Sequence, residues 1–236
     1  AAEQLHDARA LCDQLRPLTK EFFSNECKHR LPTPTERRWM QLELLEVGID
    51  MKNADFTRAF HRASLVVDNA ENCESPELAL KAQIVVGEVQ LRAGSSAAAL
   101  NTLLPSVRVA QAAELWESFS KCMMLIAEAV SAFQGPEKSK IILNSVRGCV
   151  LENGPTVEKA KCHLLTACIA IEELKKNAAD DSVRSEMLTL LSTSKSENQR
   201  AKKLFTEAED IAGMRDCIVL EKLIAEKFES FGIKSS

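Results

Sequence analysis

The central part of the sequence repeats itself when it is shifted by forty residues. Three sets of residues recur at this spacing: a lysine (Lys81, Lys121 and Lys161), the small residue after it (Ala82, Cys122 and Cys162), and a second small residue further along (Gly87, Ala127 and Ala167). Each repeat holds two stretches of helical apolar spacing separated by a turn. A period of this length predicts stacked helix pairs, because one pair cannot bury its apolar faces alone.

The recurring small residues indicate where the two helices of a pair cross closely, since a larger side chain would push the axes apart. Ala99 follows Gly87 at the same spacing at which Ser139 follows Ala127. This arrangement is similar to that of tetratricopeptide (TPR) repeats, which place small residues near the eighth and twentieth positions. We therefore predict an all-α fold, a right-handed α-solenoid of TPR-like helix-turn-helix repeats with a period near 40 residues. Gly87, Ala127, Ala167 and Ala99 are the expected packing positions.

Proline, glycine and capping residues give the expected helix boundaries. We expect helices over 36–52, 55–71, 76–93, 96–114, 115–134, 136–153, 155–176, 199–213 and 214–231, and a helix or helix pair over 1–30 with a break at Pro17. Thr35 is the expected N-cap of the first of these helices, and Pro105 is expected to bend the one that contains it. The Ser- and Asp-rich segment 177–198 is expected to be a loop-rich insertion with a brief helix. The chain 1–236 is expected to form one superhelix and to be a piece of a longer polypeptide.

The composition excludes several classes of function. A net charge of -4 and a pI near 5.7 argue against nucleic acid as a partner, because phosphate binding needs a basic surface. No apolar run approaches the ~20 residues needed to cross a bilayer, so no membrane association is expected. The eight cysteines include no C-x-x-C pair, which favours reduced thiols in a protein of the nucleus and cytoplasm.

No pattern of residues indicates catalysis or metal binding. The nearest approach to a metal-ligand set is Cys149, Cys162, His163 and Cys168, but Cys162 and Cys168 point in different directions on one expected helix. No nucleophile elbow and no glycine-rich phosphate loop occur. We expect a protein that is not an enzyme and that has no cofactor and no small-molecule ligand.

Protein binding is the function that remains. The similarity to TPR repeats implies that the first helix of each pair lines a concave face, where Lys81, Lys121 and Lys161 would form a ladder. Glu88 and Glu128 would stand on the same face. The alternative interpretation is that these lysines are solvated residues at helix starts.

Several short runs follow one another from residue 97 onward. They are ALNTLLPS at 99–106, AEA at 127–129, GPEK at 135–138, ILNSV at 142–146, KAKC at 159–162, AKKLF at 201–205 and DC at 216–217. Their order resembles the C-terminal TPR superhelix of the subunit 5 family of the anaphase-promoting complex (the cyclosome). The segment 177–198 is longer and richer in serine than in that family.

This resemblance implies a non-catalytic scaffold in a multi-subunit ubiquitin ligase of mitosis and cell division. Members of the family lie in the platform of the complex and contact other protein subunits. Two alternatives stay open: a peptide or cargo adaptor resembling kinesin light chains, and a regulatory helical domain of a separate enzyme.

Overall fold

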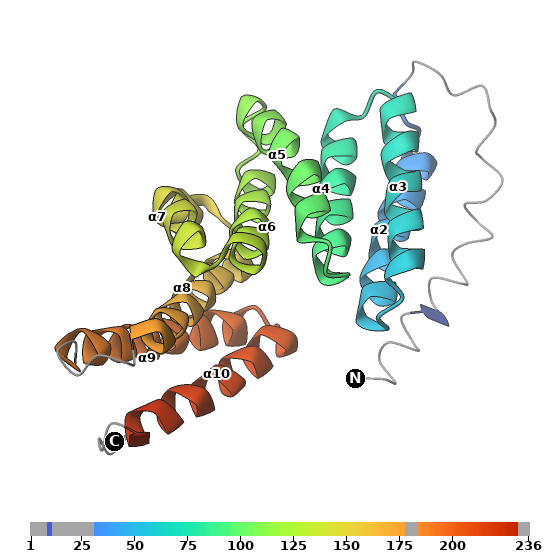
Figure 1. Cartoon of the computed structure of the whole chain (residues 1–236). Coiled ribbons are helices and arrows are strands. Elements are labelled where there is room, and N and C mark those ends of the chain that lie inside the picture. The colour runs from blue at the N-terminus through green and yellow to red at the C-terminus, as the bar shows by residue number, and fades with distance from the viewer. Residues whose placement is uncertain (1–8, 11–30, 178–183, 231–236) are drawn as a thin grey trace. The chain divides into compact units, whose positions relative to one another are not determined.

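The computed structural model describes residues 9–10, 31–177 and 184–230, and its regular elements are all α-helices (Figure 1). The helices are α2 (Pro34–Lys52), α3 (Phe56–Asn72), α4 (Pro76–Arg92), α5 (Ser96–Ala112), α6 (Trp116–Gln134), α7 (Pro136–Asn153), α8 (Thr156–Asn177), α9 (Arg184–Glu207) and α10 (Ile211–Ser230). The all-helical prediction is confirmed for this part of the chain. The helix expected over 1–30, with its break at Pro17, lies outside the described residues except for Arg9 and Ala10. No helix of the described residues is both long and apolar enough to pass through a bilayer.

From α2 to α8 the helix boundaries fall within about two residues of those expected, although the first cap differs. Thr33, not Thr35, is the N-cap of α2. Its hydroxyl accepts from the Glu36 backbone N–H at 3.2 Å, while the Glu36 carboxylate accepts from the Thr33 N–H at 2.7 Å. This reciprocal capping box satisfies two N–H groups at once, so Thr33 caps the helix more effectively than Thr35 could. Pro105 lies inside α5, which continues through it.

The same type of turn ends α2, α3, α4 and α9. A residue in the left-handed conformation follows each helix, and the next backbone N–H bonds to the carbonyl five residues earlier. The left-handed residues are Ala54, Glu74, Gly94 and Glu209, with φ of 58°, 47°, 81° and 55°. The bonds run from Asp55 to Asp50, Ser75 to Ala70, Ser95 to Gln90 and Asp210 to Phe205, at 2.8–2.9 Å. Because this turn satisfies the last carbonyl groups, the next helix begins directly after it.

The expectation of a loop-rich insertion at 177–198 is wrong for the residues that the structure describes. Helix α8 reaches Asn177, and α9 begins at Arg184 and runs without interruption to Glu207. The helices expected at 199–213 and 214–231 are corrected to α9 and α10, which begins at Ile211. Residues 178–183 lie outside the described residues.

A buried stripe at helical spacing explains why α9 is continuous. It consists of Met187, Leu191, Ser194, Asn198, Ala201 and Phe205. Ser194 donates its hydroxyl hydrogen to the Ala167 carbonyl at 2.9 Å, and Asn198 donates its amide hydrogen to the Cys217 carbonyl at 3.0 Å. Each of these buried polar residues makes a hydrogen bond to a neighbouring helix, so it can occupy the core face.

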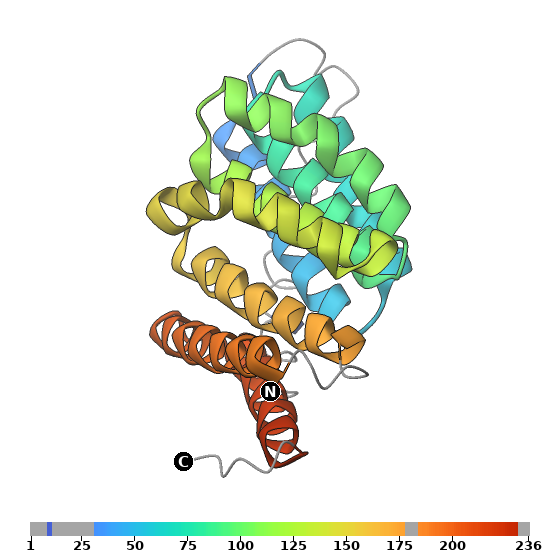
Figure 2. The same ribbon diagram turned by 60° about the vertical axis from the view of Figure 1, so that its left-hand side comes forward.

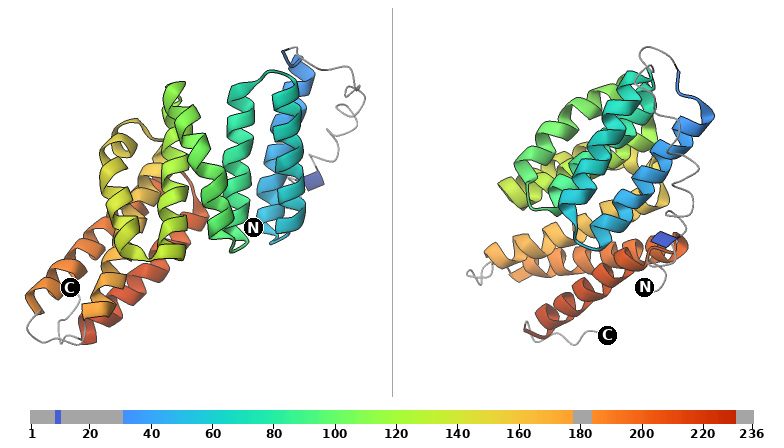
Figure 3. Two further views of the ribbon diagram at one scale, coloured as in Figure 1. Left: turned by 45° about the horizontal axis from the view of Figure 1, so that its top comes forward. Right: turned by 90° about the vertical axis from the view of Figure 1, so that its right-hand side faces the viewer.

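The chain divides into two compact units, Ala1–Glu114 and Leu115–Ser236, and each is described by itself. In the first unit, α2, α3 and α4 lie side by side (Figure 3), and α5 packs against α4. Two core clusters each draw on α2, α3 and α4. One contains Trp39, Met40, Val66, Ala70, Leu78, Ala79 and Ala82, and the other contains Val47, Ala59, Ala63, Val86 and Val89.

In the second unit, each helix again packs against the next one along the chain. Figure 2 shows this for α8, α9 and α10, coloured from orange to red. One core cluster joins α6, α7 and α8 through Met124, Leu143, Val146, Val150, Cys162 and Ile169. Two further clusters join α8, α9 and α10 through Ala167, Ile171, Leu174, Met187, Leu191, Leu220 and Ile224, and through Ala160, Ala201, Phe205 and Cys217. Sequential packing of this kind is typical of an α-solenoid.

Replacing Gly87 with alanine is expected to destabilise the first unit by about 1–2 kcal/mol. Gly87 lies on α4 where α5 crosses it, and a Cβ atom there would stand 2.6 Å from Cγ and Cδ2 of Leu103. Urea unfolding followed by Trp39 fluorescence, with Trp116 changed to phenylalanine, would measure the effect. Gly48→Ala on α2 is the control, since its Cβ meets nothing within 4 Å and should stabilise by about 0.5–1 kcal/mol. Equal behaviour of the two variants would contradict the close crossing.

Candidate protein-binding groove

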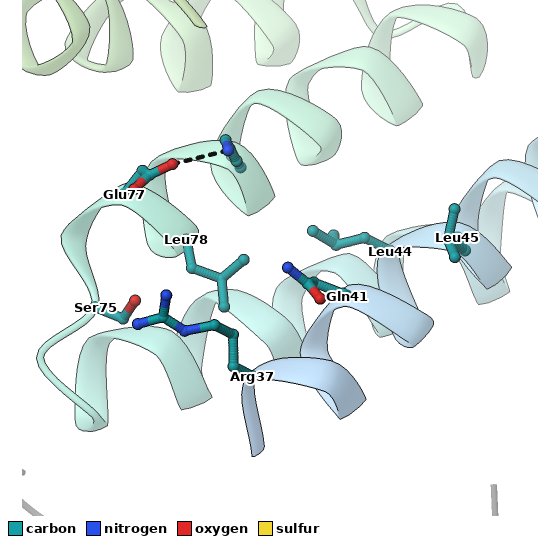
Figure 4. Close-up of a pocket in the computed structure, with 8 residues that line it drawn as sticks. Arg37, Gln41, Leu44, Leu45, Ser75, Glu77 and Leu78 are labelled. Carbon is teal, nitrogen blue, oxygen red and sulfur yellow. Dashed lines mark hydrogen bonds and ion pairs between the residues drawn. The ribbon is translucent and has the colours of Figure 1, made fainter. Parts of the chain in front are cut away.

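A groove of about 460 Å³ lies between α2 and α4 in the first unit (Figure 4). It is lined by Arg37, Gln41, Leu44, Leu45, Ser75, Glu77, Leu78 and Lys81. The α2 residues follow one another at helical spacing, so they share one face of that helix. Helices α2 and α4 contact each other, and α3 packs against both. The groove thus lies between the first helices of two successive helix pairs.

The walls of the groove combine apolar side chains with charged ones. Leu78 is buried and belongs to the core, whereas Leu45 is 66% exposed. Lys81 donates a hydrogen bond to Glu77 at 2.8 Å, drawn as the dashed line in Figure 4. That hydrogen bond, the charge of Lys81 and the charge of Arg37 together hold the pKa of the Glu77 carboxyl below its ordinary value of 4.5, against the opposing effect of burial. Glu77 is therefore ionised at neutral pH and already has a cationic partner.

Arg37 is the cation of the groove without a close carboxylate. Its guanidinium extends toward Ser75 and Leu78 in Figure 4. No carboxylate among the described residues lies within ion-pair distance of it; its charge acts on Glu77 only from further away. The groove accordingly presents one available positive charge beside an apolar wall.

The predicted lysines are distributed over both units. Lys81 lies on α4 at the edge of the groove. Lys121 on α6 and Lys161 on α8 belong to the second unit, where Lys161 pairs with Glu158 at 3.0 Å. A ladder of all three lysines would span the two units, so it stays a prediction. Glu88 on α4 and Glu128 on α6 are half-buried.

The predicted packing residues lie at helix crossings. Ala127 and Ala167 are fully buried, and the carbonyl of each accepts a hydrogen bond from a serine of the following helix. Ser139 donates to Ala127 at 2.7 Å, as Ser194 donates to Ala167. Ala99 is also fully buried, and the atoms nearest to a Cβ at Gly87 belong to Leu103, one helical turn further along α5.

Sequence reasoning missed the α2 side of the groove. Arg37, Gln41 and Leu44 follow one another at intervals of four and three residues, which would have placed them on one helical face. The forty-residue register also places Gln41 opposite Lys81. Neither signal reveals that Arg37 stands close to the start of α4, because only the packing of α2 on α4 brings them together.

A buried ionic cluster lies between α2 and α3, and sequence reasoning missed it as well. Arg62 of α3 is 7% exposed and faces three carboxylates of α2. Its guanidinium donates a hydrogen bond to Glu43 at 2.6 Å and forms ion pairs with Asp50, at 3.0 Å, and with Glu46. The spacing of the three acids along α2 places them on one face. This cluster fixes α3 on α2.

A second polar cluster joins α7, α8 and α9. Arg147 donates to Glu197 at 2.8 Å and to the Thr166 hydroxyl at 2.9 Å. Nδ1 of His163 lies 2.6 Å from the same Glu197 carboxylate, and Arg200 bonds to its other oxygen at 2.9 Å. His163 thus belongs to a buried network of hydrogen bonds that holds three helices together.

Changing Glu197 to glutamine should reduce the stability of the second unit in a pH-dependent way. Burial raises the pKa of the Glu197 carboxyl, but the hydrogen bonds and charges of His163 and Arg147 outweigh it, so the pKa lies below 4.5. The ionised form therefore stabilises the fold above the unfolded-state pKa, and this contribution is lost as the pH falls through the folded-state value.

The expected loss for Glu197→Gln is about 1–3 kcal/mol at pH 7, shrinking as the pH falls below about 4.5. Urea unfolding at a series of pH values would measure it. Glu186→Gln, at an exposed position of α9, is the control. A difference that does not depend on pH would contradict the role assigned to the carboxylate.

The cysteines considered as metal ligands are embedded in the helix packing. Within the part of the chain that the structure describes, no group of three or more His, Cys, Asp or Glu side chains could hold a metal ion. Burial raises the pKa of Cys122 to about 12 and those of Cys162, Cys168 and Cys217 to about 11. These thiols are protonated at neutral pH, and Cys122, Cys162 and Cys217 serve as small core residues.

No protein-family model matches this chain, and no curated protein is significantly similar to it. The function is therefore inferred from the residues of the chain and their geometry.

Proposed function

We propose that this protein is a non-catalytic scaffold that holds other proteins, built as a right-handed TPR-like solenoid with a period near forty residues. Within that class, the function proposed is that of a platform subunit of the anaphase-promoting complex, a nuclear and cytoplasmic ubiquitin ligase of the cell cycle. The partners would be protein subunits of the same complex.

The spacing of the helices supports the forty-residue period. Helix α4 begins at Pro76, α6 at Trp116 and α8 at Thr156. The left-handed turn residues recur at the same interval, since Ala54 is followed by Gly94 and Glu74 by Glu114. Repeats of equal length that share a turn conformation favour a regular array over an irregular bundle.

The observation that carries the scaffold proposal is the sharing of cores between successive helix pairs. Every core cluster described above takes residues from three consecutive helices, namely α2–α4, α6–α8 or α8–α10. Such an array offers long side surfaces rather than an enclosed cavity, and those surfaces are suited to binding proteins. At the last described helix, Val219 is 68% exposed and Ile218 43% exposed, and these apolar side chains favour a protein neighbour there.

The assignment to the ubiquitin ligase rests on the ordered runs of residues between 97 and 217. Several of these runs contain residues that lie where two helices cross or in a core cluster. The run at 127–129 begins with Ala127, which accepts from Ser139, and the run at 201–205 ends with Phe205 in a core cluster. Runs that specify how helices pack support a common solenoid geometry more strongly than surface residues would.

Native purification of the tagged protein from dividing cells tests this proposal. We expect the protein to elute with an assembly much larger than itself, and mass spectrometry of that assembly should identify the subunits of a mitotic ubiquitin ligase. The double variant Ile218→Asp, Val219→Asp should weaken recovery of those subunits without loss of helicity. A matched variant, Glu221→Lys with Lys222→Glu, alters charges on the same helix but not its apolar area. A protein that elutes as a monomer, with no ligase subunits, would overturn the assignment.

One observation favours the second candidate, a peptide or cargo adaptor resembling kinesin light chains. The groove between α2 and α4 places apolar and charged side chains side by side, as a peptide site would require. Recovery of motor or cargo proteins in place of ligase subunits in the same purification would favour this alternative.

A further inference from the structure

We propose that the groove between α2 and α4 binds an acidic, aliphatic segment of a partner protein, with one carboxylate of that segment held by Arg37 and Ser75. This inference rests on the proposed protein-binding function and names the chemistry of the partner. It applies whether the chain is a platform subunit or an adaptor.

Ser75 provides an unusual polar group at the base of the groove. It is the N-cap residue of α4, yet its hydroxyl makes no capping hydrogen bond. The residue is only 9% exposed, and its hydroxyl has no partner among the described residues. The hydroxyl lines the groove and is not fully shut off from solvent, so it can donate its hydrogen to a ligand bound there.

The start of α4 adds a second attraction for an anion. The first N–H groups of a helix have no intrahelical partners, and the helix dipole places partial positive charge there. At this start, Pro76 has no N–H group. The N–H groups of Glu77 and Leu78 have no acceptor within α4, because the first helical hydrogen bond runs from the Ala79 N–H to the Ser75 carbonyl. Arg37 reaches toward the same end from α2 (Figure 4). A guanidinium, a hydroxyl and a helix N-terminus together form a site suited to a carboxylate.

The charge balance of the groove favours a carboxylate over a phosphate group. Glu77 lies in the first turn of α4, but Lys81 pairs with it and neutralises it. Arg37 then leaves one positive charge for the partner. A doubly charged phosphate would leave one negative charge without a counter-charge in the groove, whereas a single carboxylate matches the one positive charge that Arg37 offers.

The apolar wall determines what must lie beside the carboxylate. Leu44 is half-buried, Leu45 is 66% exposed, and Leu78 closes the groove on the α4 side. A leucine, isoleucine or methionine next to the acidic residue would cover Leu45 and remove its surface from water. The expected partner sequence therefore has a large aliphatic residue next to an Asp or a Glu.

Selection of peptides from a random dodecapeptide phage library against the 236-residue chain tests the proposal. We expect the enriched peptides to contain Asp or Glu beside Leu, Ile or Met. The strongest binder, made with a fluorescent label, should lose about tenfold or more in affinity for Arg37→Glu and several-fold for Ser75→Ala and Leu45→Ser. Changing the acidic residue of the peptide to its amide should reduce the affinity about as much as Arg37→Glu does. When the amide peptide is measured against the Arg37→Glu protein, the combined loss in binding free energy should be smaller than the sum of the two single losses.

Arg38→Glu is the matched control. Arg38 is also exposed on α2 but does not line the groove, so the same change in net charge should alter affinity by less than about twofold. Equal losses for Arg37→Glu and Arg38→Glu, an enrichment of basic or purely apolar peptides, or no enrichment at all would overturn the proposal. Tighter binding of a phosphoserine version of the peptide would overturn the choice of a carboxylate. If the groove variants fail to affect any peptide while native assembly is retained, this inference fails and the scaffold function stands.

Discussion

Replacing Arg62 with alanine is expected to lower the free energy of unfolding of the first unit by about 3–5 kcal/mol. Arg62 is the shared buried counter-charge of Glu43, Glu46 and Asp50, all of which are at least nine-tenths buried. Removing Arg62 takes away the most buried cation of the cluster, and the loss of a desolvated counter-charge costs far more than the loss of a surface pair. Urea unfolding monitored by Trp39 fluorescence in a Trp116→Phe background would measure the change, because Trp39 lies in the core of this unit.

Arg58→Ala is the control for this experiment. Arg58 also contacts Asp50, at 3.5 Å, but its side chain is 46% exposed. Its loss should cost no more than about 1 kcal/mol, as is usual for exposed pairs. A loss below about 1 kcal/mol for Arg62→Ala itself would show that the buried cluster contributes little to the packing of α3 on α2.

Gly213→Ala is expected to destabilise the second unit by up to about 3 kcal/mol, despite the higher helix propensity of alanine. A Cβ atom at this position of α10 would stand 2.4 Å from Cδ1 and Cε1 of Phe205. The Phe205 ring is 1% exposed and packs with Ala160, Ala201 and Cys217, so it has no free space into which to move. The effect should exceed that of Gly87→Ala, because the contact is shorter and a leucine side chain adapts more easily than an aromatic ring.

Two further variants isolate the steric cause. Gly148→Ala on α7 should be neutral or stabilising, since its Cβ meets nothing within 4 Å. Phe205→Leu combined with Gly213→Ala should be less destabilised than the sum of the two single changes, because the smaller side chain relieves the contact. Hydrogen exchange of α9 and α10, together with urea unfolding followed by circular dichroism, provides the measurement. Strict additivity would count against a direct clash.

Most helices could be predicted because their boundaries depend on local chemistry. Pro76 and Pro136 begin helices at residues whose N–H groups would have no partner in any case, and Gly94 permits the left-handed turn before α5. The same turn at Glu74 uses a residue that does not favour this conformation. Its position was nevertheless predictable, because the proline after Ser75 marks the next start.

Helix α9 could not be predicted by reading apolar residues alone. Ser194 and Asn198 occupy the buried face and look like loop residues in the sequence. They are tolerated there only because carbonyl groups of other helices, at Ala167 and Cys217, accept their hydrogens. Those acceptors become known only with the tertiary structure. Counting serine and asparagine as possible core residues at helical spacing would have extended the helix.

The groove itself was not predicted, for a related reason, although one of its residues was. Lys81 was found because it recurs with the repeat, but Arg37 and Ser75 do not recur. Their importance comes from the packing of α2 against the start of α4, and no period in the sequence encodes it. Similarly, the acids that surround Arg62 look like an ordinary solvated face until α3 covers them.

Helix α8 belongs to the cores on both of its sides, and this has a consequence for how the second unit comes apart. Cys162 and Ile169 are buried against α6 and α7, while Ile171 and Leu174 are buried against α9 and α10. Detaching either neighbouring pair would expose the apolar residues of α8 on that side, so the two pairs are coupled through this helix as well as through the Arg147–Glu197 bond between α7 and α9. A protein that binds α10 would therefore also raise the free energy of unfolding of α6 and α7, although it contacts neither of these helices. Backbone amides of α8 should be the last in this unit to exchange with solvent.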